Sequence, residues 1–209
     1  MKGGTVILAN GDFPASPHSL RILQEAERIV CCDGAAQALL AHAMEPTVVI
    51  GDLDSIPEEL KEKLHGKIIK VAEQDTNDLN KAFRYCLSQG WLDITILGAT
   101  GKREDHTLGN ISLLADFAKQ APAIRMVTDS GLFLPMLSSG TISCTPGQQV
   151  SIFALDSDTP IVSHGLKYPL NGLVPHRWWE ATLNEAHGDS FTLEFPESKS
   201  LLLFLAWLV

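Results

Sequence analysis

The 209-residue sequence predicts an α/β protein in which a parallel sheet flanked by helices is followed by a smaller all-β domain. Short apolar runs alternate with amphipathic stretches up to about residue 127, which is typical of parallel strands joined by right-handed crossovers. After about Gly131, prolines and glycines separate short apolar runs and no long helical period remains, which indicates a sandwich or a barrel. We therefore expect two domains, at residues 1–134 and 135–209.

The apolar pattern assigns the individual elements. Residues 5–9 form a continuous apolar run, as expected of a strand that is covered on both faces. Ser16 and Pro17 supply an N-cap and a first-turn proline for the helix that follows. The expected strands of the first domain are residues 5–9, 29–32, 47–50, 67–71, 93–97 and 124–127. The expected helices are residues 16–28, 35–44, a segment opening at Pro57, 78–89 and 106–119. The expected strands of the second domain include residues 149–155, 190–195 and 201–209.

Composition and charge exclude several classes of function. The chain carries 16 Lys and Arg against 25 Asp and Glu, so its net charge of −9 argues against a nucleic-acid partner. The longest apolar run, residues 201–209, is far shorter than the roughly 20 residues that a membrane helix needs, and the N-terminal apolar run is too short for a signal peptide. The four cysteines have no CxxC spacing, which indicates buried thiols in a reducing compartment. We expect a soluble cytoplasmic protein with no membrane or nucleic-acid partner.

Polar turns follow four of the expected strands. They begin at Asn10, at Asp33, at Gly51 and at Gly98. Because the carboxyl ends of parallel strands lie along one edge of a sheet, these turns come together where open α/β sheets bind ligands. Helix capping would explain one or two such residues, but four polar turns of this kind predict a ligand site.

Asp52 and Asp54 form the sharpest pair of acids. In an extended segment, residues two apart point the same way, so both carboxylates can face one divalent cation. Mg²⁺ takes one or two protein carboxylates and fills its other positions with water and phosphate oxygens. The alternative is that Asp54 or Ser55 caps the helix that begins near Pro57, but this leaves Asp52 without a role. We favour a metal site.

Acidic residues also stand near two expected helix starts. Asp78 either caps or begins the helix that carries Lys81, or it adds a third carboxylate to a site for a metal-bound polyphosphate. Asp105 is expected to cap the next helix, a role that is compatible with a catalytic one. A histidine such as the neighbouring His106 more often has a structural role, through hydrogen bonds, than the role of a catalytic base.

The loop over residues 98–106 is the expected phosphate contact. Gly98 and Gly101 let the backbone approach a ligand, while Lys102 and Arg103 can neutralise phosphate oxygens. The loop is not a P-loop, because the first Walker glycine and the Ser or Thr after the lysine are both missing. No GxGxxG fingerprint for a nicotinamide or flavin cofactor is present either.

Taken together, these residues resemble the thiamine pyrophosphokinase family. The matching segments are spread over most of the chain in the family's order, and their combination is far more specific than any one of them. They are residues 33–36 (DGAA), 51–55 (GDLDS), 75–78 (DTND) with Lys81, 98–110 (GATGKREDHTLGN), 165–170 (GLKYPL) and Asn184-Glu185.

The resemblance implies a fold, a reaction and an assembly. The family has a Rossmann-like ATP-binding domain followed by a smaller β-sandwich that binds thiamine. Its members transfer pyrophosphate from ATP to the hydroxyl of thiamine with Mg²⁺, giving thiamine diphosphate and AMP. They are homodimers with a shared active site.

The resemblance also implies roles for individual residues. Mg²⁺ would be held by Asp52, Asp54 and Asp78, and Asp105 would orient or deprotonate the thiamine hydroxyl, so that these four acids form the catalytic set. ATP and its phosphates are expected at Asp33, Gly34, Lys81, Gly98, Gly101, Arg103 and His106. Thiamine is expected at Trp179, Asn184 and Glu185.

Some residues depart from the family's pattern. Asn77 replaces the usual Thr, and Leu183 replaces the usual Ser. Trp178 and Trp179 either stack on the thiazolium cation or pack in a core or an interface. Two other functions stay open: a pyrophosphokinase for another alcohol, such as a hydroxymethylpterin, and a nucleotide-binding module without catalysis.

Overall fold

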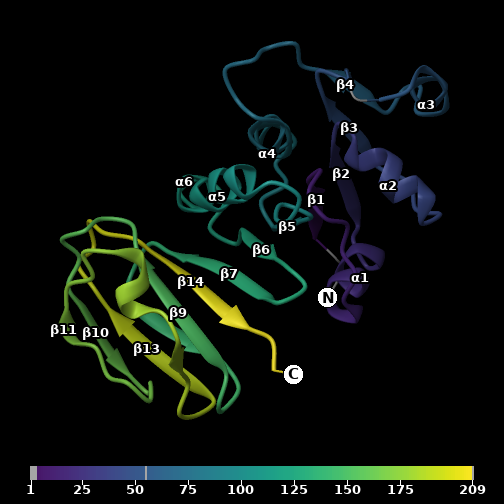
Figure 1. Cartoon of the computed structure of the whole chain (residues 1–209). Helices are drawn as coiled ribbons and strands as arrows, with labels where there is room; N and C mark the ends of the chain where they lie inside the picture. Colours follow the sequence, from purple (N-terminus) through teal and green to yellow (C-terminus); the bar gives the residue numbers. More distant parts are fainter. Residues whose placement is uncertain (1–3, 55, 209) are drawn as a thin grey trace. The chain divides into compact units, whose positions relative to one another are not determined.

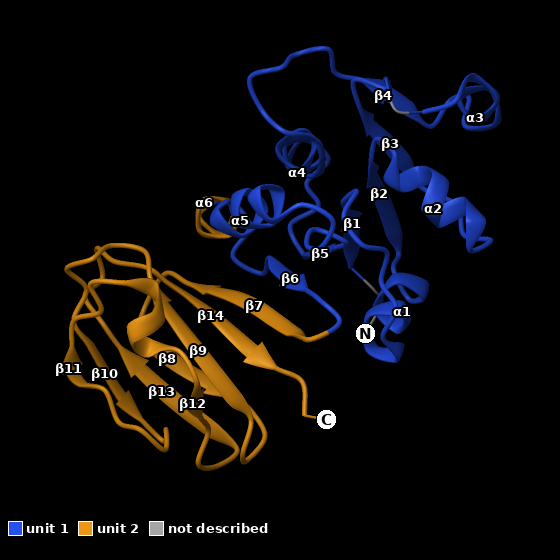
Figure 2. Ribbon diagram, viewed as in Figure 1, with its two compact units in different colours: residues 1–113, 120–129 blue, residues 114–119, 130–209 orange. Residues whose placement is uncertain are grey.

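The computed structural model describes residues 4–54 and 56–208, which divide into two compact units. Unit 1 comprises residues 1–113 and 120–129, and unit 2 comprises residues 114–119 and 130–209 (Figure 2). The strand pairs within unit 1 are parallel and those within unit 2 are antiparallel. In the part of the chain that the structure describes, no helix has the length and apolar character that a membrane crossing requires.

A parallel sheet forms the centre of unit 1, with the strand order β6-β5-β1-β2-β3-β4 (Figure 1). Its strands are β1 (Thr5–Leu8), β2 (Arg28–Cys32), β3 (Val48–Gly51), β4 (Ile68–Lys70), β5 (Ile94–Leu97) and β6 (Arg125–Val127). Every residue of β1, β3 and β5 is buried, which confirms that the apolar runs mark strands covered on both faces. Because β1 pairs with both β2 and β5, the strand order reverses beside β1.

Helices connect these strands. They are α1 (Pro17–Gln24), α2 (Ala35–Ala41), α3 (Glu58–Lys63), α4 (Asp78–Ser88) and α5 (Glu104–Ser112). The helix expected over residues 106–119 is instead two helices, α5 and α6 (Leu114–Ala118). None of the residues of α5 is buried, whereas α6 buries four of its five residues and contacts β7 and β14 of unit 2. The two segments therefore bury apolar surface differently, and the prediction of one continuous helix was wrong.

The start of α1 is fixed by a residue far away in the sequence. Ser16 caps the helix, as the sequence predicts, because its hydroxyl accepts the Ser19 amide at 3.1 Å. The carboxylate of Asp129, which follows β6, accepts the amides of Ala15 and Ser16 and, at 2.7 Å, the Ser19 hydroxyl. Burial alone would raise the pKa of Asp129, but these hydrogen bonds lower it overall.

Unit 2 is built from two antiparallel sheets, in the orders β12-β9-β14-β7 and β11-β10-β13-β8. Their strands are β7 (Gly131–Met136), β8 (Gly140–Ser143), β9 (Gln149–Ala154), β10 (Ile161–His164), β11 (Asn171–Leu173), β12 (Asn184–Glu185), β13 (Ser190–Glu194) and β14 (Leu201–Ala206). The strands expected at residues 149–155, 190–195 and 201–209 are thus present, although β14 ends at Ala206 and Val209 lies outside the described residues. The expected boundary at 134/135 falls inside β7.

Both sheets of unit 2 contribute to one hydrophobic core. Alternate residues of β9 and β14, such as Ile152 and Leu203, point into it from one sheet. Ile161, Phe191 and Leu193 enter it from the other. A short 3-10 helix, η1 (Trp178–Ala181), contacts β9 and buries only Ala181.

Candidate active site

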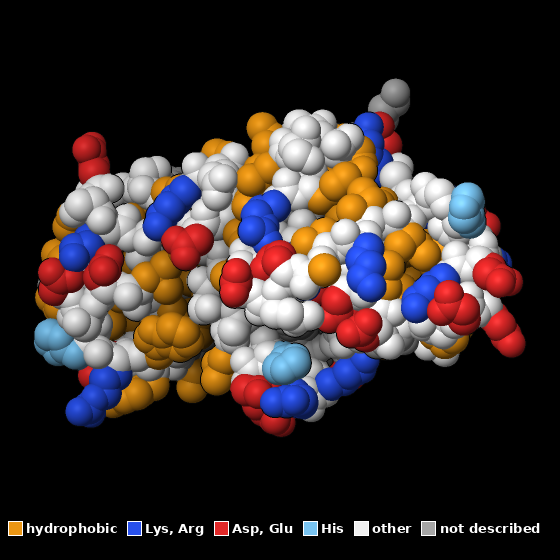
Figure 3. Space-filling view, turned by 90° about the horizontal axis from the view of Figure 1, so that it is seen from above, with side chains coloured by type: hydrophobic (Ala, Val, Ile, Leu, Met, Phe, Trp, Pro, Cys, Tyr) orange, Lys and Arg blue, Asp and Glu red, His pale blue; other side chains and the backbone are white. Residues whose placement is uncertain are grey.

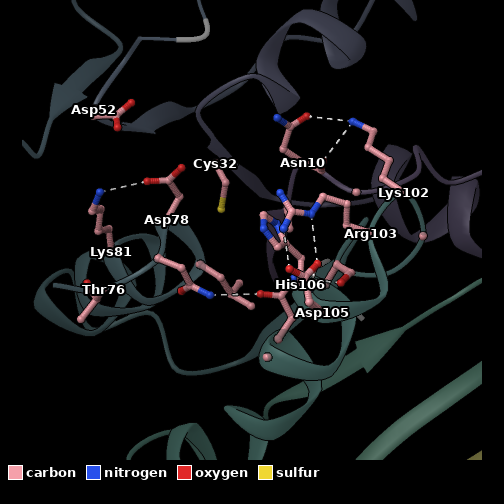
Figure 4. Close-up of a pocket in the computed structure, with 18 of the residues that line it drawn as sticks. Asn10, Cys32, Asp52, Thr76, Asp78, Lys81, Lys102, Arg103, Asp105 and His106 are labelled. Carbon is pink, nitrogen blue, oxygen red and sulfur yellow. Dashed lines mark hydrogen bonds and ion pairs between the residues drawn. The ribbon is translucent and has the colours of Figure 1, made fainter. Parts of the chain in front are cut away.

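A cavity of about 590 Å³ opens at the carboxyl edge of the sheet in unit 1 (Figure 4). Residues that follow β1, β3 and β5 line it, together with residues at the starts of α4 and α5. Figure 4 shows Asp52, Asp78 and Lys81 on one side of the cavity and Arg103, Asp105 and His106 on the other. We call these the α4 side and the α5 side. On the face shown in Figure 3, acidic and basic side chains are interspersed and no continuous basic surface is seen.

Backbone hydrogen bonds join the turns after β1 and β5 at the carboxyl edge of the sheet. Gly11 donates its amide to the carbonyl of Gly98 at 2.6 Å, and Asp12 donates to that of Thr100 at 2.9 Å. A Cβ on Gly101, whose φ is +79°, would lie 2.0 Å from the Asp12 carboxylate, so only glycine fits there. The two turns are held close by backbone contacts that larger residues would prevent.

Asp52 stands directly after β3 on the α4 side. Its carboxylate accepts the amide of Asp54 at 3.1 Å and the side-chain amide of Gln74 at 3.3 Å, and these bonds lower the pKa of Asp52. Asp54 is exposed and is not among the residues that line the cavity. It does not cap α3 either, because the N-cap position is Pro57; Ser55, the other expected cap, lies outside the described residues.

Asp78 occupies the first turn of α4 and faces the cavity. The cap of α4 is Asn77, whose side chain accepts the amide of Asn80 at 3.0 Å, so the Asp78 carboxylate is free of that task. It accepts a hydrogen bond at 3.1 Å from Lys81, whose side chain is only 2% exposed. Burial raises the pKa of Asp78, and the charge of Lys81 opposes that rise. The buried Lys81 side chain therefore lies in the cavity wall with Asp78 as its partner.

The residues expected to contact ATP lie in and around this cavity. Four of them line it: Lys81, Gly101, Arg103 and His106. Gly98 and Asp33 do not line the cavity but are next to residues that do. Gly98 precedes Ala99 in the turn after β5, and Asp33 follows Cys32 at the end of β2. The Asp33 carboxylate is close enough to Asp78 to raise its pKa. Gly34 is the N-cap residue of α2.

Arg103 and Asp105 pair with each other on the α5 side. The guanidinium donates to both carboxylate oxygens, at 3.1 and 2.5 Å, and holds the pKa of Asp105 below its usual value. Both side chains are more than half exposed, so they can exchange this partner for a ligand at little cost. The expectation that Asp105 caps α5 was wrong, because the helix begins at Glu104 and the N-cap position is Arg103.

The carboxylates of the cavity fit a metal ion that takes some of its ligands from a bound substrate. Among the described residues, no three His, Cys, Asp or Glu side chains gather closely enough to bind a metal by themselves. Asp52 and Asp78 nevertheless line the same cavity and interact electrostatically. Mg²⁺ is commonly held by one or two carboxylates together with phosphate oxygens and water, which these two residues can provide in part.

The residues expected to contact thiamine lie in unit 2. Asn184 is buried, accepts the amides of Tyr168 and Glu185 at 3.1 and 2.9 Å, and donates to the Tyr168 carbonyl at 2.7 Å. Glu185 pairs with Lys167 at 3.0 Å. Trp179 is 68% exposed, whereas Trp178 meets the ring of Phe153 edge-on. Asn184 is therefore occupied in holding its own unit together.

Several residues that line the cavity were not singled out from the sequence. They are Gln74, Thr76 and Asn110. Each lies in or beside a turn or helix that the sequence analysis identified. Its closeness to that segment was the signal that could have placed it at the cavity. Lys102, which donates to the backbone and side-chain oxygens of Asn10 at 3.0 and 3.2 Å, joins two of these turns.

The fold and the cavity define a class of protein. The carboxyl edge of its parallel sheet carries carboxylates, a buried lysine, and an arginine beside a glycine-rich turn. This arrangement is typical of enzymes that transfer phosphoryl groups from a nucleotide. Residues 20–126 match the thiamin pyrophosphokinase catalytic domain, and residues 131–203 match the thiamin pyrophosphokinase substrate-binding domain. The chain belongs to the thiamin pyrophosphokinase family.

Individual relatives agree with this assignment. The chain is 29% identical over 185 residues to thiamin pyrophosphokinase 1 of Caenorhabditis elegans, covering 80% of this chain and 75% of that protein. Among solved structures, thiamin pyrophosphokinase from Geobacillus thermodenitrificans superimposes with a TM-score of 0.78 at 26% identity, covering 98% of this chain and 97% of that one. The Bacillus subtilis enzyme gives a TM-score of 0.79 at 25% identity over 98% and 100% of the two chains.

Proposed function

We propose that this chain transfers the pyrophosphoryl group of ATP to the hydroxyl of thiamine, giving thiamine diphosphate and AMP. The observation that carries the proposal is the cavity at the sheet edge, in which carboxylates on the α4 side face a paired arginine and carboxylate on the α5 side. Membership of the family supplies the two substrates.

In this reaction the thiamine hydroxyl oxygen forms a bond to the β-phosphorus, and the bond from that phosphorus to the bridging oxygen of AMP breaks. Asp105 orients the hydroxyl and takes its proton: Arg103 lowers the pKa of Asp105 while the two are paired, and release of Arg103 to phosphate makes the carboxylate a better base. Arg103 exchanges Asp105 for phosphate oxygens, and Lys81 adds a second positive charge at the α4 side. Positioning and charge stabilisation supply most of the rate in such transfers.

Mg²⁺ belongs to this proposal as the ion that accompanies ATP. Asp52 and Asp78 would hold it, with Asp54 beside them as the third expected ligand. When bound, the ion neutralises charge on the transferred group and on the departing AMP. The low pKa of Asp52 supports this assignment, because the carboxylate stays ionised.

The remaining features of the family are proposed on the same basis. The reversal of strand order beside β1 supports a Rossmann-like description of unit 1, and the shared core of two antiparallel sheets supports a β-sandwich in unit 2. A homodimer with a shared active site follows from the resemblance, and would recruit Trp179, Asn184 and Glu185 to thiamine. Buried free thiols, such as Cys32 and Cys86, support a cytoplasmic location.

One assay tests the proposed function. The protein is mixed with Mg-ATP and thiamine, and AMP and thiamine diphosphate are measured together; we expect them in equal amounts, and no AMP when thiamine is left out. AMP that forms only with a hydroxymethylpterin would contradict the proposal in favour of another alcohol. Binding of ATP without any turnover would contradict it in favour of a nucleotide-binding module.

A further inference from the structure

Two asparagine side chains connect the α4 side of the cavity to the α5 side. The side-chain amide of Asn77, just before α4, donates to the side-chain oxygen of Asn110 on α5 at 3.2 Å. The side-chain amide of Asn110 in turn donates to the carbonyl of Ala99, in the turn after β5, at 2.9 Å. All three residues line the cavity, so this bridge spans the site itself.

Each end of the bridge lies next to groups that the proposed reaction uses. Asn77 precedes Asp78 and is one helical turn from Lys81. Ala99 lies between Gly98 and the glycine, lysine and arginine of residues 101–103. The bridge joins two residues that are 33 positions apart in the sequence. Along the chain, α4 and β5 lie between them. The bridge therefore links the two sides directly at the cavity, in addition to the packing of α4 on β1, β2 and β3 and the pairing of β5 with β1.

The two tasks of Asn77 use two atoms of its side-chain amide, one that accepts and one that donates. Its side-chain oxygen is occupied by the cap of α4, where it accepts from the backbone and the side chain of Asn80 at 3.0 and 3.3 Å. Its N–H group is what reaches Asn110. Asp would cap the helix equally well but has no N–H to donate, and Thr caps with a shorter side chain.

We propose that Asn77 and Asn110 are positioning residues that set the spacing between the α4 and α5 sides of the cavity for the polyphosphate of the nucleotide. This inference rests on the proposed function. The Asn77→Thr variant keeps a capping hydroxyl and loses the bridge, so we expect kcat/KM for Mg-ATP to fall about three- to tenfold, the range for one lost hydrogen bond. The KM for thiamine and the unfolding temperature should stay near those of the wild type.

A double-mutant cycle with Asn110→Ala separates the bridge from a local effect. If Asn77 acts through Asn110, Asn77→Thr causes no further loss of kcat/KM in the Asn110→Ala background. The matched control is Asn80→Ala, which removes one contact of Asn77 but leaves the bridge, and it should keep wild-type kinetics. Equal losses in both backgrounds, or wild-type kcat/KM in Asn77→Thr, would overturn the inference.

A calorimetric titration with Mg-ATP measures binding and therefore gives this test a result that does not depend on turnover. If the wild type forms no thiamine diphosphate, the proposed function fails, but the same cycle can be measured as the dissociation constant of Mg-ATP. Coupled weakening of binding in the two single variants supports the bridge. Unchanged binding in both of them contradicts it.

Discussion

The cavity of unit 1 and the segment around Asn184 in unit 2 were both predicted to be functional, but their polar atoms are used differently. Asp52 follows β3 and is partly exposed, Asp105 lies in the first turn of α5 and is mostly exposed, and both hold partners that a ligand can replace. Asn184 is only 4% exposed, and its side-chain oxygen and nitrogen are both engaged by backbone groups of its own unit. A motif residue can thus serve a ligand or serve the fold, and its hydrogen-bond partners distinguish the two.

The sharpest test of this comparison is Asp52→Asn. We expect kcat to fall about 100-fold or more, because the amide cannot replace a charge that acts on the transition state. Among the described residues, Asp52 accepts hydrogen bonds from Asp54 and Gln74, which are both exposed, so the unfolding temperature should change little. Turnover and thermal unfolding are measured on the same preparation; a variant that unfolds early would mean that Asp52 serves the fold.

Asn184→Ala is the counterpart in unit 2. It leaves two amides and a carbonyl without their partner, so we expect a loss of about 2 kcal/mol or more in the free energy of unfolding. Denaturant unfolding measures the loss, and Mg-ATP binding should be unchanged. A variant as stable as the wild type would contradict this structural role, whereas a raised KM for thiamine is expected in addition if Asn184 also lines the proposed thiamine site.

Arg103→Ala should have an intermediate effect on the cavity. Loss of charge-assisted hydrogen bonds to phosphate should raise the KM for Mg-ATP about tenfold, with a smaller change in the KM for thiamine. The variant also frees Asp105 from its ion pair. Steady-state kinetics with each substrate varied in turn provide the measurement, and the reverse pattern of KM values would contradict the assignment.

Trp179 and Trp178 offer a matched pair within η1. Trp179 is mostly exposed, so Trp179→Ala should leave stability unchanged and raise the KM for thiamine about threefold if its ring meets the thiazolium cation. Trp178→Ala removes the contact with Phe153 and should lower the unfolding temperature instead. Identical effects of the two variants would show that exposure does not separate their roles.

The smallest effect is expected at Glu73, which organises the loop before α4. Hydrogen bonds from the Thr76 hydroxyl, from Arg84 and from the loop amides lower the pKa of Glu73 to about 2. A carboxylate with a lowered pKa stabilises the fold above its unfolded pKa, near 4.5, and loses that contribution as the pH falls toward 2. Glu73→Gln should therefore be slightly less stable than the wild type at pH 6, and the difference in unfolding temperature should shrink by pH 3.5.

Most of the fold could be predicted because burial leaves a clear pattern in the sequence. Continuous apolar runs marked β1, β3 and β5, since strands covered on both faces have no polar side. The break between α5 and α6 could not be predicted, because it depends on α6 contacting β7 and β14, which lie later in the chain. Local sequence does not encode which distant surface a helix covers.

The candidate site was predictable in outline for a topological reason. Turns that follow parallel strands meet at one edge, so acids and glycines from distant segments were expected together. Their individual tasks depend on neighbours one to three residues away: Asn77 rather than Asp78 caps α4, and Asp105 pairs with Arg103 instead of capping α5. Such choices between nearby polar groups are decided by geometry that spacing alone does not reveal.

The contact between Asp129 and the start of α1 has a consequence for synthesis of the chain. The amides of Ala15 and Ser16 and the Ser19 hydroxyl receive their carboxylate partner only after the ribosome has made more than 100 further residues. The central strand, β1, likewise waits for β5 before both of its edges are paired. Ser16 can cap the first helix early in synthesis, but the carboxylate that binds the start of this helix is present only when all of unit 1 has been translated.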